Sequence, residues 1–286
     1  MLSGLPKDTA EPAQEYYVTV DLQHSTEEWK SPILKRMGAL KGSRVFVYTL
    51  SNSSISLGRS ELPSRISAIT VLRHPNVPAV LDVLLDERYI HIVTEASALP
   101  PLLCHLVSLP EYTLEYVREL FTEMCRIVGE LHSLNLFHGW IGPLSFRIDP
   151  SSGRVVLEDM YSGFLADTEA LRKVLARYPA FLPPELGGAR QHSSAKSDVY
   201  ALGLLLDLMA TGGCCQRGEA PEGELQAVGE LVAAMTTPLA RRPALHDVLH
   251  HPFFGRPEDD APVPPLVAPQ RRLAQWIRTC GQQQQQ

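Results

Sequence analysis

The chain has no run of about 18 uncharged apolar residues, and its residues 1–14 lack a basic segment followed by an apolar core. We therefore expect no transmembrane segment and no entry into the secretory route. Cysteine is scarce as well: there are 5, and none has the CxxC spacing typical of zinc or redox sites. This usage indicates a reducing compartment and predicts a cytoplasmic protein.

An excess of positive charge is also missing. The formal net charge is -6, which argues against a nucleic-acid partner bound by bulk electrostatics. By contrast, 44% of the 286 residues are hydrophobic, enough to bury one large core or the cores of two lobes.

Hydrophobic patterning changes along the chain, with short alternating runs in roughly the first 100 residues and longer helical periods after them. The alternation predicts strands over 16–22, 44–50, 80–85 and 89–95. Three- and four-residue spacing predicts helices over 64–73, 114–133 and 199–210, the last apolar nearly all round. Beyond residue 255, closely spaced prolines and the run Gln282–Gln286 predict a mostly disordered tail.

Four landmarks in the second half follow one another in a distinctive order. They are Ser197-Asp198-Val199-Tyr200-Ala201-Leu202-Gly203, Pro183-Pro184-Glu185, Arg242-Pro243 and His251-Pro252-Phe253-Phe254. With Leu72-Arg73-His74-Pro75-Asn76-Val77 and Ile92-Val93-Thr94-Glu95, they resemble the protein kinase fold over about residues 30 to 254. The resemblance implies that Asp198 pins the backbone of a loop beginning at His138, and that Arg242 pairs with Glu185.

The fold class implied is α+β and bilobal, with a small antiparallel β-rich N-lobe carrying one helix and a larger α-helical C-lobe. Four segments follow: an N-terminal extension (1–29), an N-lobe (30–97), a C-lobe (98–254) and the Pro-rich and poly-Gln tail (255–286).

Aligned on the same resemblance, the catalytic positions of kinases carry other residues here. Trp140 stands at the catalytic aspartate, Gly58 at the strand lysine and Arg65 at the helix glutamate that pairs with it. Gly142 and Ser145 replace the loop lysine and the metal-binding asparagine. An indole accepts no proton, and Gly58 and Arg65 form no ion pair. The alignment therefore predicts no catalytic residue, and we expect Trp140 to pack against the cleft floor or the activation segment.

The binding positions are only partly kept. The segment 38–45, at the place of the glycine-rich loop, retains Gly38 and also contains Lys41 and Gly42, which makes these three weak nucleotide-binding candidates. Lys41 or Arg59 could replace the missing lysine from a neighbouring strand. Asp159 aligns with the magnesium-binding aspartate and is, with Glu158, a weak metal candidate. We expect no cofactor.

These substitutions predict a catalytically inactive pseudokinase, not an enzyme, that acts as a protein-binding scaffold or allosteric regulator. Two alternatives stay open: a nucleotide-sensing pseudokinase switch, and an atypical protein kinase with rearranged catalytic residues.

Two further resemblances bear on partners. The N-lobe motifs Val45-Phe46-Val47-Tyr48 and Val93-Thr94-Glu95-Ala96 are similar to those of the Scy-like pseudokinases of membrane trafficking. The acidic segment 258–264 is similar to the peptide by which Tribbles pseudokinases recruit a ubiquitin ligase. The partners implied are proteins: an active kinase, trafficking factors or a ubiquitin ligase.

Overall fold

The computed structural model describes residues 16–19, 33–40, 43–55, 61–109, 112–165, 179–187, 194–212 and 222–255, and the statements below concern these residues. Gly58, Arg59, Lys41, Gly42 and the acidic tail segment 258–264, all singled out in the sequence, lie outside them. None of the described helices is both long enough and apolar enough to cross a membrane.

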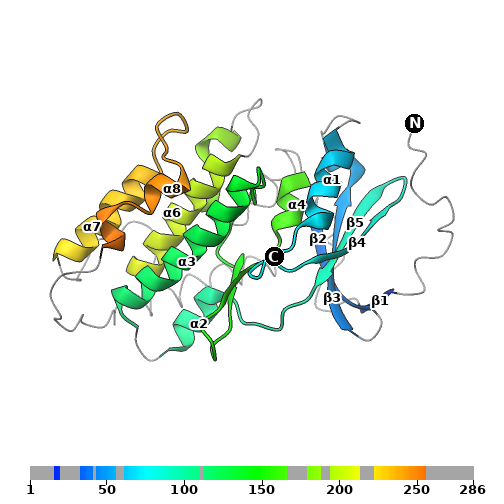
Figure 1. Ribbon diagram of the computed structural model, residues 1–286, viewed down its shortest axis with the longest axis horizontal. Coiled ribbons are helices and arrows are strands. Elements are labelled where there is room, and N and C mark those ends of the chain that lie inside the picture. The colour runs from blue at the N-terminus through cyan, green and yellow to red at the C-terminus, as the bar shows by residue number, and fades with distance from the viewer. Residues whose placement is uncertain are drawn as a thin grey trace.

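The described part of the chain forms two lobes, one built on a sheet and one built of helices (Figure 1). The sheet has five antiparallel strands in the order β1-β2-β3-β5-β4. Their bounds are Tyr16–Thr19 (β1), Ile33–Leu40 (β2), Ser43–Ser51 (β3), Val80–Leu85 (β4) and Tyr89–Glu95 (β5). A single helix, α1 (Glu61–Val71), packs against this sheet beside β4. The predicted α+β bilobal architecture is therefore confirmed.

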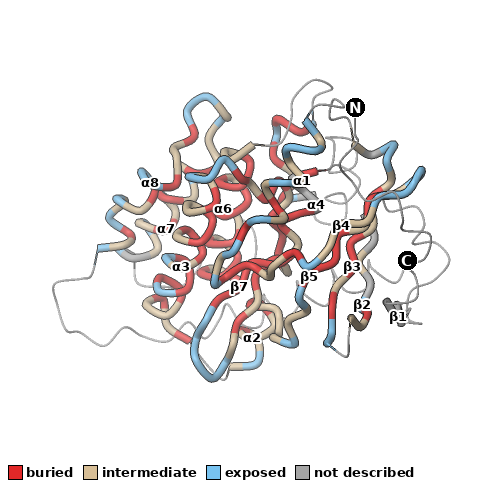
Figure 2. Tube along the Cα trace, turned by 45° about the vertical axis from the view of Figure 1, so that its right-hand side comes forward, coloured by how far each residue is buried: buried red, intermediate tan, exposed pale blue. Residues whose placement is uncertain are grey.

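The helical lobe is organised around two long helices that lie side by side, α3 (Leu114–Ser133) and α6 (Ala195–Thr211) (Figure 1). The side chain of Thr113 caps α3 by accepting the amide hydrogen of Tyr116 at 3.1 Å. Buried residues recur along α3 at three- and four-residue steps, whereas α6 is buried nearly all round. Figure 2 shows the resulting core as a continuous buried region through α3 and α6.

Shorter elements complete the fold. The remaining helices are α2 (Leu102–Ser108), α4 (Met160–Leu165), α7 (Glu222–Met235) and α8 (Leu245–Val248), and a hairpin is formed by β6 (Phe146–Ile148) and β7 (Val155–Leu157). Single 3-10 turns span Asn52–Ser54 (η3), Pro179–Phe181 (η4), Pro184–Gly187 (η5) and Pro252–Phe254 (η6).

The sequence prediction missed strand β2 and the helices α2, α4, α7 and α8, and it misplaced several ends. Residues 33–40, which had no predicted structure up to Gly38, form β2, and Gly38 pairs with Val45 inside the sheet. Helix α1 begins at Glu61 and helix α6 at Ala195, both earlier than the apolar spacing indicated. The first turn of α1 contains Pro63, which marks a helix start, and that of α6 contains Lys196, Ser197 and Asp198, so an apolar period does not detect either turn.

Candidate functional site

A buried carboxylate at the start of α6 holds the loop that follows α3. Asp198 is fully buried and accepts hydrogen bonds from the backbone amides of His138 and Gly139, both at 2.8 Å. It also accepts one from Nε2 of His132 at 3.0 Å. Because these bonds compensate the desolvated charge, the loop backbone is fixed against α6. These are the contacts that the resemblance implied for Asp198.

A second buried ion pair joins η5 to the segment before α8. Arg242 donates to both carboxylate oxygens of Glu185, at 2.7 and 3.1 Å. Burial alone would raise the pKa of Glu185, but the hydrogen bonds from Arg242 outweigh it and the pKa is lowered. This pair, which the resemblance also implied, ties the segment in front of α6 to the end of the helical lobe.

The loop itself presents Trp140 toward the cleft between the lobes. Its indole Nε1 donates to the backbone oxygen of Asp159 at 3.2 Å, and its ring lies 5.9 Å from the ring of His138. Trp140 is half-buried against the main core, as expected from the sequence. Further along, the Ser145 side chain accepts the amide hydrogen of Gly142 at 2.9 Å. Ser145 and Gly142 therefore stabilise the turn of the loop.

His138 links this loop to the end of β7. Its Nε2 bonds the backbone oxygen of Glu158 at 2.9 Å, while its Nδ1 accepts the amide hydrogen of Trp140 at 3.3 Å. These two bonds require a neutral ring with the proton on Nε2. Burial lowers the pKa of His138, which favours the same neutral form.

The charged centre of the cleft is formed by Lys35 of β2 and two consecutive acids that follow β7. The ammonium of Lys35 lies 2.8 Å from Oδ1 of Asp159 and 3.0 Å from Oε2 of Glu158. It also lies 4.0 Å from the centre of the Phe46 ring. The neighbouring strand β3, which carries Phe46, also contributes Tyr48, whose hydroxyl donates to Asp159 Oδ1. Burial first, and then the neighbouring Asp159, raise the pKa of Tyr48 well above its ordinary value, so the hydroxyl keeps its proton.

The backbone at Asp159 explains why this carboxylate faces the lysine. Asp159 has a φ of 63°, a left-handed conformation that Asp adopts more readily than most residues. The turn reverses the chain between the end of β7 and the start of α4. It places the Asp159 side chain under β2 and β3.

Glu158 is the most deeply buried acid of this centre. Its side chain is 1% exposed, and its Oε2 accepts from both Lys35 and Nε of Arg147, the latter at 3.1 Å. Its other oxygen, Oε1, is buried and has no hydrogen-bond partner among the residues that the structure describes. A buried carboxylate oxygen without a donor is costly and marks a place where a cation or a donor fits.

The structure brings together only some of the residues that the sequence singled out. His138, Trp140, Gly142, Ser145 and Asp159 lie in or beside the loop and the charged centre. Arg65 of α1 is half-buried elsewhere, 5.7 Å from the ring of Phe137, and desolvation lowers its pKa. Gly38 lies within β2.

Lys35 was missed by the sequence interpretation, which looked for a substitute cation at Lys41 or Arg59. The apolar pattern gave no signal for this residue, because Lys35 and Arg36 interrupt the alternation in the strand Ile33–Leu40. Among the described residues, no group of three or more His, Cys, Asp or Glu side chains is gathered for a metal ion.

Comparison with known proteins adds to the geometry. The profile of the family described as "Protein kinase domain" matches residues 41–248. CBL-interacting protein kinase 25 of Oryza sativa subsp. japonica is 30% identical over 167 residues, which are 55% of this chain and 32% of that protein. CBL-interacting protein kinase 22 of the same plant is 29% identical, over 53% of this chain and 36% of that protein. Serine/threonine-protein kinase kin-29 of Caenorhabditis briggsae is 22% identical, over 54% and 19%.

These relatives overturn one expectation. The sequence analysis predicted that the chain is not an enzyme, whereas the relatives that match it are named as protein kinases, one of them a serine/threonine kinase. The prediction of a non-enzyme is therefore wrong. It considered a substitute cation only at Lys41 or Arg59, and not at Lys35 of β2. The matches span about a third or less of these relatives' own lengths.

Proposed function

The chain belongs to the protein kinase domain family, and on that premise we propose that it is an atypical protein kinase with rearranged catalytic residues. It transfers the γ-phosphoryl group of ATP to a hydroxyl group of a protein substrate. The observation that carries this proposal is the ion pair between Lys35 and Asp159, at 2.8 Å. In the alignment with kinases, the uncharged Gly58 stands at the position of the strand lysine. Lys35 supplies that cation from β2 instead.

Lys35 is the residue that binds the phosphates. A lysine ammonium is a compact point charge that contacts phosphate oxygens well, and kinases need one such charge above the metal-binding aspartate. Its side chain is 26% exposed and supported by the ring of Phe46, so the ammonium is held at the cleft and remains accessible. In the absence of nucleotide its charge is balanced by Asp159 and Glu158.

Asp159 and Glu158 fit a magnesium ion. Mg²⁺ prefers carboxylate oxygens, and within the described part of the chain the buried Oε1 of Glu158 has no partner. When bound, the ion would neutralise charge on the phosphates. Arg147 bonds Oε2 of Glu158 and thereby keeps that carboxylate oriented.

The rearranged centre has Trp140 where kinases have the aspartate that accepts the proton of the substrate hydroxyl, so its catalysis depends less on that proton transfer. In phosphoryl transfer the transition state is loose, and most of the catalysis comes from positioning and charge neutralisation. Trp140 occupies the position aligned with the proton acceptor, and its bond to the Asp159 backbone positions that residue. We therefore expect a slow transferase whose rate depends on Lys35 and Asp159.

The proposal is tested by incubating the purified full chain with magnesium and ATP labelled at the γ-phosphate, together with a mixture of Ser/Thr-containing proteins. Incorporation into protein is expected, and it is lost in both Lys35→Met and Asp159→Asn. Arg88→Met is the matched control, because Arg88 is an exposed cation in the turn between β4 and β5. Incorporation that is absent from the wild type, or unchanged in both cleft variants, would contradict the proposal.

A further inference from the structure

The buried carboxylate of Glu158 is contacted by two cations, and these come from different lobes. Nε of Arg147 lies 3.1 Å from Oε2 of Glu158, and Nζ of Lys35 lies 3.0 Å from the same oxygen. Arg147 belongs to β6 of the helical lobe, whereas Lys35 belongs to β2 of the N-lobe. One carboxylate oxygen is therefore shared by two cations across the cleft.

Arg147 and Glu158 are held together by a single hairpin. Strand β6 pairs with β7, which ends directly before Glu158, and the Glu158 amide donates to the backbone oxygen of Ser145 at 2.8 Å. This pair therefore forms within one rigid piece of the chain. The pair of Lys35 with Glu158, by contrast, depends on a strand of the other lobe. Arg147 is thus the permanent partner of this carboxylate, and Lys35 is the exchangeable one.

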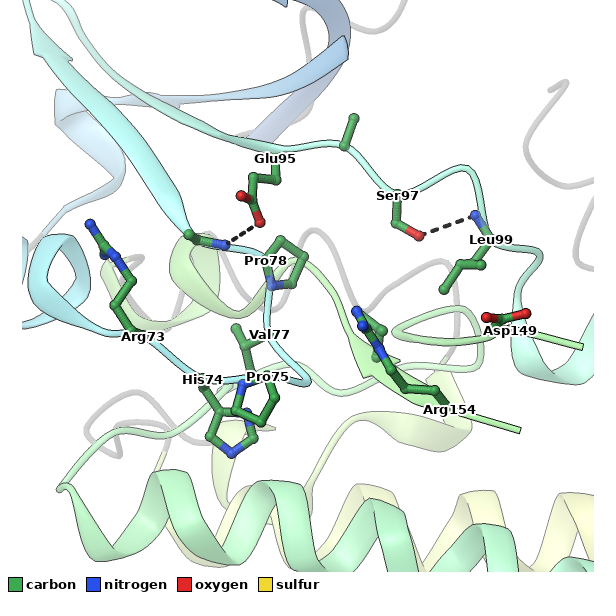
Figure 3. A pocket seen from close by; sticks show the side chains of 13 residues that line it. Arg73, His74, Pro75, Val77, Pro78, Glu95, Ser97, Leu99, Asp149 and Arg154 are labelled. Carbon is green, nitrogen blue, oxygen red and sulfur yellow. Dashed lines mark hydrogen bonds between the residues drawn. The ribbon is translucent and has the colours of Figure 1, made fainter. Parts of the chain in front are cut away.

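The connection between the lobes also fixes Arg147. Its Nη1 donates to the backbone oxygen of Leu99 at 3.3 Å, and the next amide, that of Ile148, donates to the backbone oxygen of Pro100 at 3.1 Å. Figure 3 shows Leu99 on this connection, with its amide bonded to the side chain of Ser97. The guanidinium is therefore held on two sides, and the Arg147 side chain is only 21% exposed.

Phosphate groups compete with Glu158 for Lys35. The ammonium of Lys35 has three N–H donors, and in this structure two of them are used by Glu158 and Asp159. Binding several phosphate oxygens draws these donors away from the acids. The Glu158 side chain is 1% exposed, and a carboxylate buried so deeply is strongly destabilising when it loses its cation. Because Arg147 stays in place, Glu158 remains paired when Lys35 leaves it.

We propose that Arg147 is a positioning residue for nucleotide binding, which holds the charge of Glu158 so that Lys35 can move to the phosphates. The inference rests on the proposed function, because it takes Lys35 as the phosphate-binding residue. Arg147 itself contacts no phosphate, and its effect passes through Glu158 and Lys35. In a chain without the Arg147 charge, Lys35 is retained by the buried acid and the nucleotide binds weakly.

Substitutions at Arg147 separate its charge from its hydrogen bond. The affinity of the full chain for magnesium-ATP is measured from the rise of the thermal midpoint with nucleotide concentration. Arg147→Gln keeps a donor without the charge and should weaken binding at least about tenfold, whereas Arg147→Lys keeps the charge and should bind within about threefold of the wild type. Arg154→Gln is the matched control and should bind like the wild type, because Arg154 is an exposed arginine in the turn of the same hairpin.

Equal affinities of Arg147→Gln and Arg147→Lys would overturn the proposal, because the charge of the side chain would then make no difference. If the wild type and Arg154→Gln bind magnesium-ATP as well as both Arg147 variants do, this inference alone falls and the proposed function stands. If the wild type binds no magnesium-ATP, both fall together. The expected affinities without any phosphoryl transfer would remove the proposed transfer and leave the role of Arg147 in place.

A measurement on the wild type decides the question even if a variant does not fold. The proton on Nε of Arg147 is followed by NMR with and without magnesium-ATP. It should exchange slowly with solvent in both samples, since the bond to Oε2 of Glu158 persists. Faster exchange in the nucleotide complex would overturn the proposal, because Arg147 would then have left Glu158 together with Lys35.

Discussion

Lys35 and Asp159 are separated by 124 positions in the sequence, and their side chains meet at 2.8 Å in the cleft. One residue comes from the middle of a strand in the N-lobe, and the other from the turn that precedes α4. The pair therefore joins the N-lobe to the helical lobe. Its cation and its carboxylate are the groups on which nucleotide binding depends in the proposed function.

Replacing Lys35 by Met should weaken the binding of magnesium-ATP at least tenfold, since the cation that contacts Asp159 and Glu158 from β2 is lost. A tenfold change corresponds to about 1.4 kcal/mol. Thermal unfolding with increasing nucleotide measures the affinity, because a ligand of the folded state raises the midpoint. Arg88→Met should give the wild-type curve. Equal midpoint shifts in the wild type and Lys35→Met would contradict the role of Lys35.

Arg242→Met should destabilise the chain by about 3–5 kcal/mol, because Glu185 would remain buried without its partner. The double variant with Glu185→Gln should lose less than the sum of the single losses, since the stranded charge is gone. Urea unfolding measures both. As a matched surface control, Arg126→Met should cost at most about 1 kcal/mol, because its ion pairs are half-exposed. Additive losses at the buried pair would show that the two residues are not coupled.

Acidification below the ordinary histidine pKa of 6.5 should destabilise the fold through His138. Its pKa is lower in the folded chain, so the unfolded chain binds a proton first as the pH falls. The stability present above pH 6.5 is then lost progressively toward the folded pKa, as protonation of Nδ1 breaks the bond from the Trp140 amide. Urea midpoints measured from pH 7.5 to 5 should fall more steeply for the wild type than for His138→Asn. Parallel curves would contradict a buried neutral ring.

Gly203→Ala should destabilise the helical lobe by about 1–3 kcal/mol through overpacking. A Cβ at Gly203 of α6 would lie 2.8 Å from Cβ of Met235 in α7, and neither atom can rotate away. Gly223→Ala is the matched control, because its Cβ would meet nothing within 4 Å and alanine favours a helix by about 1 kcal/mol. Chemical denaturation of both variants should give opposite signs. A neutral Gly203→Ala would mean that α6 and α7 are packed less closely.

The elements with strong periodicity could be predicted from the sequence. The bounds of α3, β4 and β5 agree with the predicted ranges, because apolar residues dominate β4, alternate in β5 and repeat at helical spacing in α3. Strand β2 could not be found in this way, since Lys35 and Arg36 interrupt its apolar pattern and Gly38 favoured a loop. Its structure is decided by pairing with β3, which is a tertiary effect.

The candidate site could be predicted only in part for the same reason. The loop around His138 and the acid Asp159 follow from local motifs, whose spacing is visible in the sequence. The position of Lys35 depends on how β2 lies over β7, and a position-by-position alignment does not detect a charge supplied from another strand. The predicted partners, an active kinase, trafficking factors or a ubiquitin ligase, remain predictions.

The most direct test of the account is the rate at which the full chain transfers the γ-phosphate of magnesium-ATP to protein. It is measured side by side for the wild type, Lys35→Met, Asp159→Asn and Arg88→Met at saturating nucleotide. The account predicts measurable transfer by the wild type and by Arg88→Met, and at least a hundredfold loss, about 2.7 kcal/mol, in the two cleft variants. A wild-type rate no higher than that of Asp159→Asn would contradict it.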